Sequence, residues 1–342
     1  MKNRMKPLTL PLVMTFPLAM AALLLGGCSS EEREASSAGS PGHRAALEVL
    51  GASQGELQLT APGTRATSFT TLTSGEIGVF LNPKTLGDYT PQNNVKYTAS
   101  SVSGGSTVWT SSEALFFTDA IAYVCAYHPY TAGSNYENPT AMRLKTQEYS
   151  AAVDFSFAKN VPMNSTDGVA SGTEEGAGNQ VVFKMSRAYA LLVLNFKRGN
   201  IKDGCTIARI EVSATGLNSE NTLNISTGAY GSPAASPDNK FILDKEITVP
   251  QNTSTASVSQ QILMVPTAML SNLKLTLKLK SAGRPALGVK VMEISKFEAG
   301  KRYTLNLTVN STGIAIGSMQ VTTGWDDDAL KNDDGNTDLV PV

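Results

Sequence analysis

The sequence is poor in the residues on which most enzymes depend. It has two histidines, three cysteines and two tryptophans in 342 residues. His43 lies in a polar N-terminal stretch, and His128 lies in the segment Tyr127-His-Pro-Tyr130. They leave little for a Ser-His-Asp or Cys-His arrangement, and they give no histidine pair for a zinc site. No Gly-x-Ser-x-Gly, phosphate-loop or dinucleotide motif follows a strand-like segment. We therefore expect no enzyme activity, no catalytic residues, no metal and no cofactor.

Charge is also scarce. Charged residues make up 17% of the chain and the net charge is -1, so a basic field for binding nucleic acid is absent. Aromatic residues make up only 7%, which leaves few platforms on which sugars stack. A carboxylate pair for glycoside hydrolysis stays open, because its spacing is three-dimensional. The run 326–328 of three aspartates lacks the alternate spacing of a calcium loop and indicates a solvated charge cluster.

Long apolar runs are missing except at the N-terminus. Lys2, Arg4 and Lys6 precede an almost wholly apolar stretch that ends in Leu25-Gly26-Gly27-Cys28. Small residues before a cysteine admit the lipoprotein signal peptidase, and the cysteine then carries lipid. We predict a signal peptide at 1–27 and lipidation of Cys28 with diacylglycerol and a fatty acyl chain such as palmitate. The alternative is a membrane anchor with a chance cysteine at its end.

The next segment is polar and has little to bury. Residues 29–42 are rich in Ser, Ala, Gly, Glu and Pro, a composition typical of a flexible tether. Two further cysteines, Cys125 and Cys205, lie far apart and outside any metal-type spacing. Two buried thiols are the expectation, and a disulfide between them stays open.

Most of the remaining chain shows strand periodicity. Apolar residues alternate without an error from Leu273 to Leu279 and again from Tyr303 to Val309. Further short apolar runs are separated by Gly, Asn, Ser, Thr and Pro clusters, and lie at 77–81, 120–127, 190–196, 207–212 and 262–265. No segment after the signal peptide has ten residues of clean helical periodicity. We predict an all-β chain with few short helices, in which the Gly-rich stretch 164–179 separates an N-terminal β-sandwich at 66–180 from a C-terminal one at 181–342.

Several segments resemble, in order, those of a known family. They are Thr64-Arg65-Ala66-Thr67 with Ser74-Gly75-Glu76-Ile77-Gly78-Val79-Phe80, then Val182-Phe183-Lys184-Met185 with Arg187-Ala188-Tyr189-Ala190-Leu191, and finally Phe297-Glu298-Ala299-Gly300-Lys301-Arg302-Tyr303-Thr304-Leu305-Asn306-Leu307, the segment from Ile314 to Val321, and Trp325. Together with the lipobox they are similar to the fimbrillins, the subunits of type V pili in Bacteroidales, where a histidine often stands at the place of Arg187. The serine-acidic stretch after Cys28 also resembles a surface-export signal of Bacteroidales lipoproteins, although it also fits an ordinary solvated linker.

The resemblance implies a fold and a way of assembling. The family has two β-sandwich domains of transthyretin-like topology, and its members are secreted as lipoproteins to the outer membrane and cell surface. A trypsin-like, arginine-specific protease cuts after an arginine that follows the first strand. A strand from the next subunit then fills the groove left by the removed strand, so that the partners are other pilus subunits in a fimbrium.

These features map onto the residues around Arg65. The resemblance implies a pro-segment at 28–65, a removable strand that contains Leu57 and Leu59, and cleavage between Arg65 and Ala66. Arg44 is the second candidate for cleavage. Burial of four or five apolar side chains of the strand contributes about 1.5–3 kcal/mol each, so an empty groove would strongly favour a replacement strand. A strand inserted between two others would support this exchange, whereas a strand at a free edge would not.

The replacement strand is expected near the C-terminus. Ile314, Ile316, Met319 and Val321 alternate, but the two pairs fall out of phase across Gly317-Ser318, which indicates a bulge or turn. The acidic tail after Trp325 is a poor strand former. The chain could therefore be a stalk, tip or anchor subunit of the pilus. A monomeric surface lipoprotein that binds glycan or host protein is the alternative function.

Overall fold

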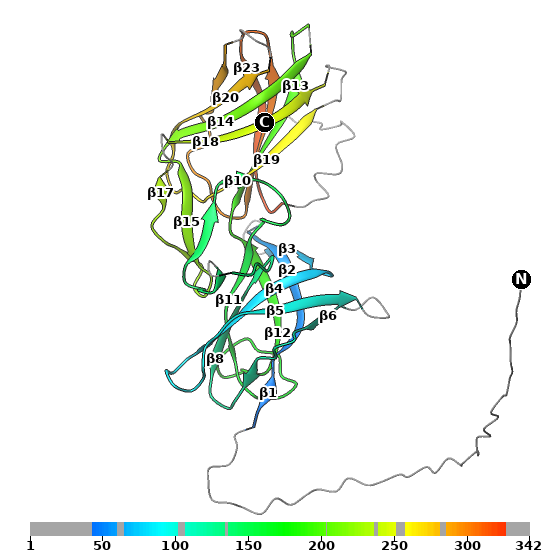
Figure 1. Cartoon of the computed structure of the whole chain (residues 1–342), viewed down its shortest axis with the longest axis vertical. Helices are drawn as coiled ribbons and strands as arrows, with labels where there is room; N and C mark the ends of the chain where they lie inside the picture. Colours follow the sequence, from blue (N-terminus) through cyan, green and yellow to red (C-terminus); the bar gives the residue numbers. More distant parts are fainter. Residues whose placement is uncertain are drawn as a thin grey trace, which may run out of the picture. The chain divides into compact units, whose positions relative to one another are not determined.

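The computed structural model describes residues 43–325, except 60–64, 102–106, 134–135, 203, 236–238, 251–256 and 281–284 (Figure 1). Within these ranges the regular structure consists of strands, which confirms the prediction of an all-β fold. The described segments contain no helix long and apolar enough to cross a bilayer.

The largest sheet is built mainly from the first half of the chain. Its eight strands are, in spatial order, β3 (Arg65–Thr71), β2 (Glu48–Leu59), β12 (Gln180–Arg187), β11 (Ser156–Met163), β8 (Ala122–His128), β4 (Gly75–Pro83), β5 (Gln92–Ser101) and β6 (Thr107–Thr110). The pair β2–β12 is parallel and the other pairs in this sheet are antiparallel. One face of the sheet buries a cluster that includes Val79, Val124, Phe183 and Met185.

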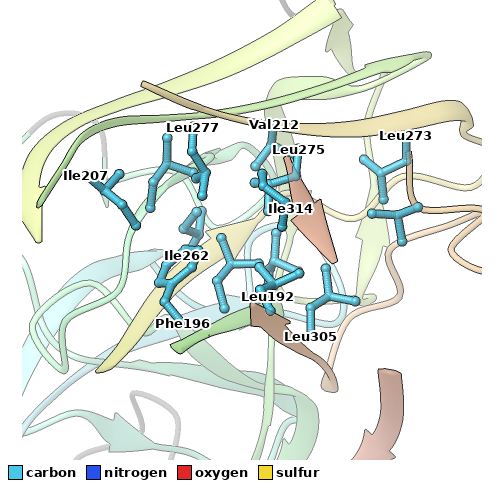
Figure 2. Packing of buried hydrophobic residues seen from close by; sticks show 14 of the residues in the cluster. Leu192, Phe196, Ile207, Val212, Ile262, Leu273, Leu275, Leu277, Leu305 and Ile314 are labelled. Atoms are coloured by element: carbon cyan, nitrogen blue, oxygen red, sulfur yellow. The ribbon is translucent and has the colours of Figure 1, made fainter. Parts of the chain in front are cut away.

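The second half of the chain supplies most strands of two sheets that share one core. The five-stranded sheet has the order β10 (Gln147–Glu148), β19 (Val258–Met264), β13 (Ala190–Arg198), β22 (Lys301–Val309) and β23 (Ile314–Thr323). The four-stranded sheet has the order β18 (Lys240–Val249), β14 (Cys205–Thr215), β20 (Ser271–Leu279) and β21 (Leu287–Lys290). Figure 2 shows side chains of both sheets meeting, with Leu192 and Leu305 facing Leu275 and Leu277.

Small strands complete the fold. Strand β15 (Asn218–Asn224) pairs with β9 (Met142–Lys145), β16 (Ala229–Tyr230) and β17 (Ala234–Ala235), and β1 (Ala45–Ala46) pairs with β7 (Phe116–Phe117). A third buried cluster contains residues from both halves of the sequence, among them Phe80, Tyr127, Tyr189 and Trp325.

The alternating segments behave as their periodicity predicts. Leu273 and Leu279 belong to β20, in which every apolar residue of the alternating series is buried, and the series from Tyr303 to Val309 is buried in β22. These strands are amphipathic, as their two-residue period indicates. One face is exposed to solvent, and the other covers the core of the second half of the chain.

Strand β12 contains the segment that resembles the opening strand of a second domain. In the structure this strand belongs to the sheet that is built mainly from the first half of the chain. It pairs with β2 and β11 in the eight-stranded sheet, because Val181, Phe183 and Met185 complete the core of that sheet. The chain passes to the five-stranded sheet only at β13, after Arg187. The domain limits themselves stay a prediction.

The two remaining cysteines are buried in different places. Cys125 belongs to the cluster shared by both halves, and Cys205 belongs to the core between the five- and four-stranded sheets. Burial raises the pKa of the Cys125 thiol to about 12, although a hydrogen bond with Ser226 opposes the shift. The expectation of two buried thiols is therefore confirmed.

Candidate functional site

Strand β2 occupies an inserted position in the eight-stranded sheet. It runs parallel to β12 from Glu48 to Gly55 and antiparallel to β3 from Ser53 to Leu59. Within the described part of the chain, β3 is the outermost strand of this sheet and β2 is its one neighbour there. The two ladders overlap at Ser53–Gly55, where β2 is paired on both sides; before these residues its ladder partner is β12, and after them it is β3.

The face of β2 that points into the core carries few apolar side chains, and these are buried. Leu47, which directly precedes β2, and Val49 and Ala52 of β2 are buried in the same cluster as Phe183 and Met185 of β12. Leu50 is an extra residue in the ladder, because Val181 is paired with Val49 whereas Val182 is paired with Gly51. This bulge turns Leu50 outward, where it and Val182 are each 50% exposed.

Beyond Ala52 the inner face of β2 becomes polar. Gln54 Nε2 donates to Asp154 Oδ2 at 3.3 Å, and the same oxygen accepts from Arg187 Nε at 3.2 Å. The Asp154 and Arg187 side chains are only 6% and 10% exposed, so their charges are largely removed from water. The attraction between these charges is correspondingly strong, and the loss of either partner would be costly.

Arg187 also contacts Trp325, the last residue that the structure describes. The Arg187 guanidinium carbon lies 4.5 Å from the centroid of the Trp325 ring, which is also packed edge-on against Tyr149 at 6.3 Å. Trp325 is 2% exposed and lies two residues after β23. A cation over an indole face is attractive, most of all where water is excluded. Asp154 and Arg187 therefore connect β2 with the segment that follows β23.

The residues at the N-terminal end of β2 are held by hydrogen bonds with the side chain and the backbone of Asn179. Asn179 Nδ2 donates to Ala46 O at 3.0 Å, and the backbone N–H of Glu48 donates to Asn179 O at 2.9 Å. Arg44, the second candidate for cleavage, precedes these contacts and its guanidinium lies 4.8 Å from the Phe116 ring centroid. Cleavage there would leave all of β1 and β2 attached to the rest of the chain.

Strand β23, which contains the candidate replacement residues, lies at an edge of the five-stranded sheet. Among the residues that the structure describes, its one neighbour in that sheet is β22. Ile314 is buried, Ile316 and Met319 are half-buried, and Val321 is 46% exposed. Gly317 is unpaired in the ladder, since Ile316 is opposite Leu307 and Ser318 is opposite Asn306. The predicted bulge is therefore confirmed.

The predicted site residues are distributed as follows. Cys28 lies outside the described residues, as do Pro62, Gly63 and Thr64. Leu57 and Leu59 belong to β2, and Arg65 and Ala66 begin β3, with Arg65 opposite Leu59. The candidate replacement residues of β23 lie in another sheet than β2, so one chain does not bring them to the groove. Their roles stay predictions.

Sequence reasoning missed the polar end of the groove. Asp154 and Arg187 are 33 residues apart, and Gln54 is 100 residues from Asp154, so no local pattern connects them. The segments that resemble the family include Arg187, but the resemblance gave no partner for this residue.

Comparisons with known proteins agree with this fold. No relative was found among curated proteins. Two crystal structures of candidate cell adhesion proteins are similar: one from Bacteroides uniformis, with a TM-score of 0.53 and 21% identity over 82% of this chain and 99% of that one, and one from Bacteroides ovatus, with a TM-score of 0.52 and 17% identity over 82% of this chain and 97% of that one. A family model described as fimbrillin-like matches residues 64–325, which is well over half of the sequence. The chain therefore belongs to the fimbrillin-like family.

Proposed function

We propose that this protein is a structural subunit of a cell-surface fimbria that polymerises by strand exchange. It is exported as a lipoprotein carried on Cys28 and is anchored in the outer membrane. An arginine-specific, trypsin-like protease then cuts between Arg65 and Ala66. The released subunit joins other pilus subunits, and the fibre supports adhesion.

The inserted position of β2 is the observation that carries the proposal. Cleavage after Arg65 separates β2 from β3 in the covalent chain, while β3 stays with the mature subunit. Loss of β2 would leave unpaired main-chain groups on β12 and on β3, because β2 lies between them. A new strand would satisfy both edges at once.

Apolar burial acts in the same direction. Leu47 and Val49 are buried against the face of β12 that carries Val181 and Phe183. Each such side chain contributes about 1.5–3 kcal/mol when it is buried, and each hydrogen bond of the ladder about 0.5–1.5 kcal/mol net. An empty groove therefore favours any strand that restores both sets of contacts, which is strand addition between chains.

Replacement of Arg65 by alanine is expected to stop assembly. The protease needs the arginine side chain, so Arg65→Ala should keep β2 in its groove and exclude an incoming strand. Cells that carry the variant should yield the uncut chain and no high-mass, heat-resistant ladder on electrophoresis of surface fractions. Arg44→Ala is the matched control and should assemble normally. A ladder of unchanged size from Arg65→Ala would show that cleavage at this bond is not required.

A further inference from the structure

A hollow of about 410 Å³ lies over the small sheet that contains β9, β15 and β17. Strands β15 and β17 lie side by side in this sheet (Figure 1). The hollow is lined by residues of these three strands and by Ser232, which lies in the turn before β17. Its volume is within the range of small-molecule sites, about 300–1,000 Å³.

The outer face of β9 and β15 forms the floor of the hollow. Leu144 of β9 is buried in the cluster shared by both halves, so the alternation of the strand turns Arg143 and Lys145 outward. In the ladder with β15, Arg143 is opposite Thr222 and Lys145 is opposite Glu220. Opposite residues of an antiparallel pair have Cβ atoms about 4.5–5.5 Å apart. Two cations, a carboxylate and a hydroxyl group therefore lie close together on one face.

The two cations of the floor are not neutralised by ion pairs. Arg143 and Lys145 are exposed, and neither has an ion-pair partner among the residues that the structure describes. Arg209 and Asp244 are opposite each other in β14 and β18 in the same way, and they do form an ion pair. The floor of the hollow therefore keeps both signs of charge available to a ligand.

The floor and one wall are held in place by contacts from below and from the side. The backbone N–H of Lys145 donates to the buried Tyr189 hydroxyl at 3.2 Å, and the N–H of Gly231 donates to Thr222 O at 2.7 Å. A Cβ atom at Gly231 would lie 2.2 Å from Thr222 Oγ1, so glycine lets the turn before β17 approach β15 closely. A preformed site loses little conformational freedom when it binds.

We propose that this hollow binds an acidic sugar, a saccharide unit that carries one carboxylate and several hydroxyl groups. The inference rests on the adhesive role in the proposed function, but not on strand exchange, because the uncut chain already contains the hollow. The planar Arg143 guanidinium binds the carboxylate of the sugar through two parallel hydrogen bonds, and the Lys145 ammonium lies beside it. The Glu220 carboxylate accepts hydrogen bonds from the sugar hydroxyls, and the Thr222 and Ser232 hydroxyls donate to them or accept from them.

The mixture of charges favours a sugar over other ligands. Inorganic phosphate and a run of acidic residues would bring negative charge toward the whole floor, where Glu220 repels it. In an acidic sugar the carboxylate and the hydroxyl groups are on different parts of the ring, so each can face the group that complements it. An apolar ligand would gain little, because it would cover charged groups without replacing their contacts with water.

Binding to the uncut chain without its signal peptide tests the proposal. The probe is a tetrasaccharide of alternating glucuronate and N-acetylglucosamine, and its affinity is measured by titration calorimetry at low ionic strength. The same tetrasaccharide with its carboxylates reduced to alcohols should bind at least tenfold more weakly. Arg143→Gln should weaken binding of the acidic probe at least tenfold, and Arg143→Lys should restore only part of it, because lysine lacks the two-pronged geometry.

Lys278→Gln is the matched control, since Lys278 is an exposed lysine of β20 in another sheet. It should bind the probe within about twofold of the unchanged chain, and the melting temperatures of all variants should agree, because each change is on the surface. A probe that does not bind, or that binds equally to Arg143→Gln, would overturn the site.

Two further ligands test the class of the ligand. Inorganic phosphate and hexaglutamate should each bind at least tenfold more weakly than the tetrasaccharide. Equal binding of either one, or of the carboxyl-reduced tetrasaccharide, would overturn the assignment to an acidic sugar. Because the measurement uses the uncut chain, these outcomes leave strand exchange untouched. Failure of the unmodified chain to form fibres would overturn the proposed function but would not change this binding.

Discussion

Ile316→Asp is expected to abolish fibre formation, with at least a hundredfold loss of polymer relative to the unchanged chain. Ile316 belongs to the predicted replacement strand, and in the proposed exchange it would be one of the apolar side chains that fill the groove left by β2. An aspartate there would place an unpaired carboxylate in an apolar groove, at a cost of several kcal/mol. A cost of about 2.7 kcal/mol already corresponds to a factor of one hundred in affinity. Polymer is measured by electrophoresis and electron microscopy of surface fractions.

Ala315→Asp is the matched control for this substitution. Ala315 is exposed on the opposite face of β23, so a carboxylate at this position stays in water in the precursor and in a strand inserted with Ile316 inward. The control should assemble within about twofold of the unchanged chain, because an exposed charge away from a buried pair has little effect. Equal loss of polymer in both variants would show that β23 does not insert with Ile316 inward.

Asp154→Ala is expected to destabilise the precursor by about 3 kcal/mol, the cost of removing one partner of a buried ion pair. Arg187 would lose the carboxylate that neutralises it, and Gln54 of β2 would lose its acceptor at the polar end of the groove. The melting temperature of the chain without its signal peptide should fall by several degrees. Release of a fragment ending in Arg65 should also become faster during protease treatment.

Glu246→Ala provides the comparison for an exposed pair. Lys280 Nζ lies 2.8 Å from a Glu246 carboxylate oxygen, and both side chains are 61% exposed. Water and salt screen such a pair, so its removal should leave the melting temperature nearly unchanged. If the two variants melted alike, the Asp154 and Arg187 pair would not be the stabilising contact that its burial indicates.

The fold was predictable where a local pattern determined it. The alternation around Leu275 and Leu305 specified amphipathic strands, and the phase change at Gly317 specified a bulge. These are local properties, because successive side chains of a strand point to opposite faces whatever the strand pairs with. The all-β class followed from the same signal.

The partners of each strand were less predictable. The pairing of Gln180 with Glu48 spans 132 residues, and neither strand carries a local mark of the other. For the same reason the sequence resembled a domain opening at β12, whereas β12 completes the first sheet. The bulge at Leu50 exists only in relation to the register of β12, so no reading of β2 alone could reveal it.

The sequence pointed to the cleavage position and to the replacement strand of the candidate site, but not to the inner-face residues of β2. Resemblance pointed to Arg65 and to the segment around Ile316, and both lie in strands with the pairing described above. The inner residues Ala52 and Gln54 were overlooked, because a small residue and an amide give no apolar alternation. Buried polar contacts such as that of Gln54 with Asp154 are specified by tertiary structure alone.

The mass and N-terminal sequence of subunits taken from purified surface fibres test the central claim most directly. Removal of β2 and its replacement by a strand of another copy require a mature chain that begins at Ala66 and carries no lipid. Intact-mass spectrometry should show this single N-terminus in the heat-resistant polymer, with the fragment up to Arg65 absent. A polymer whose subunits begin at a lipidated Cys28 and still contain β2 would contradict the account.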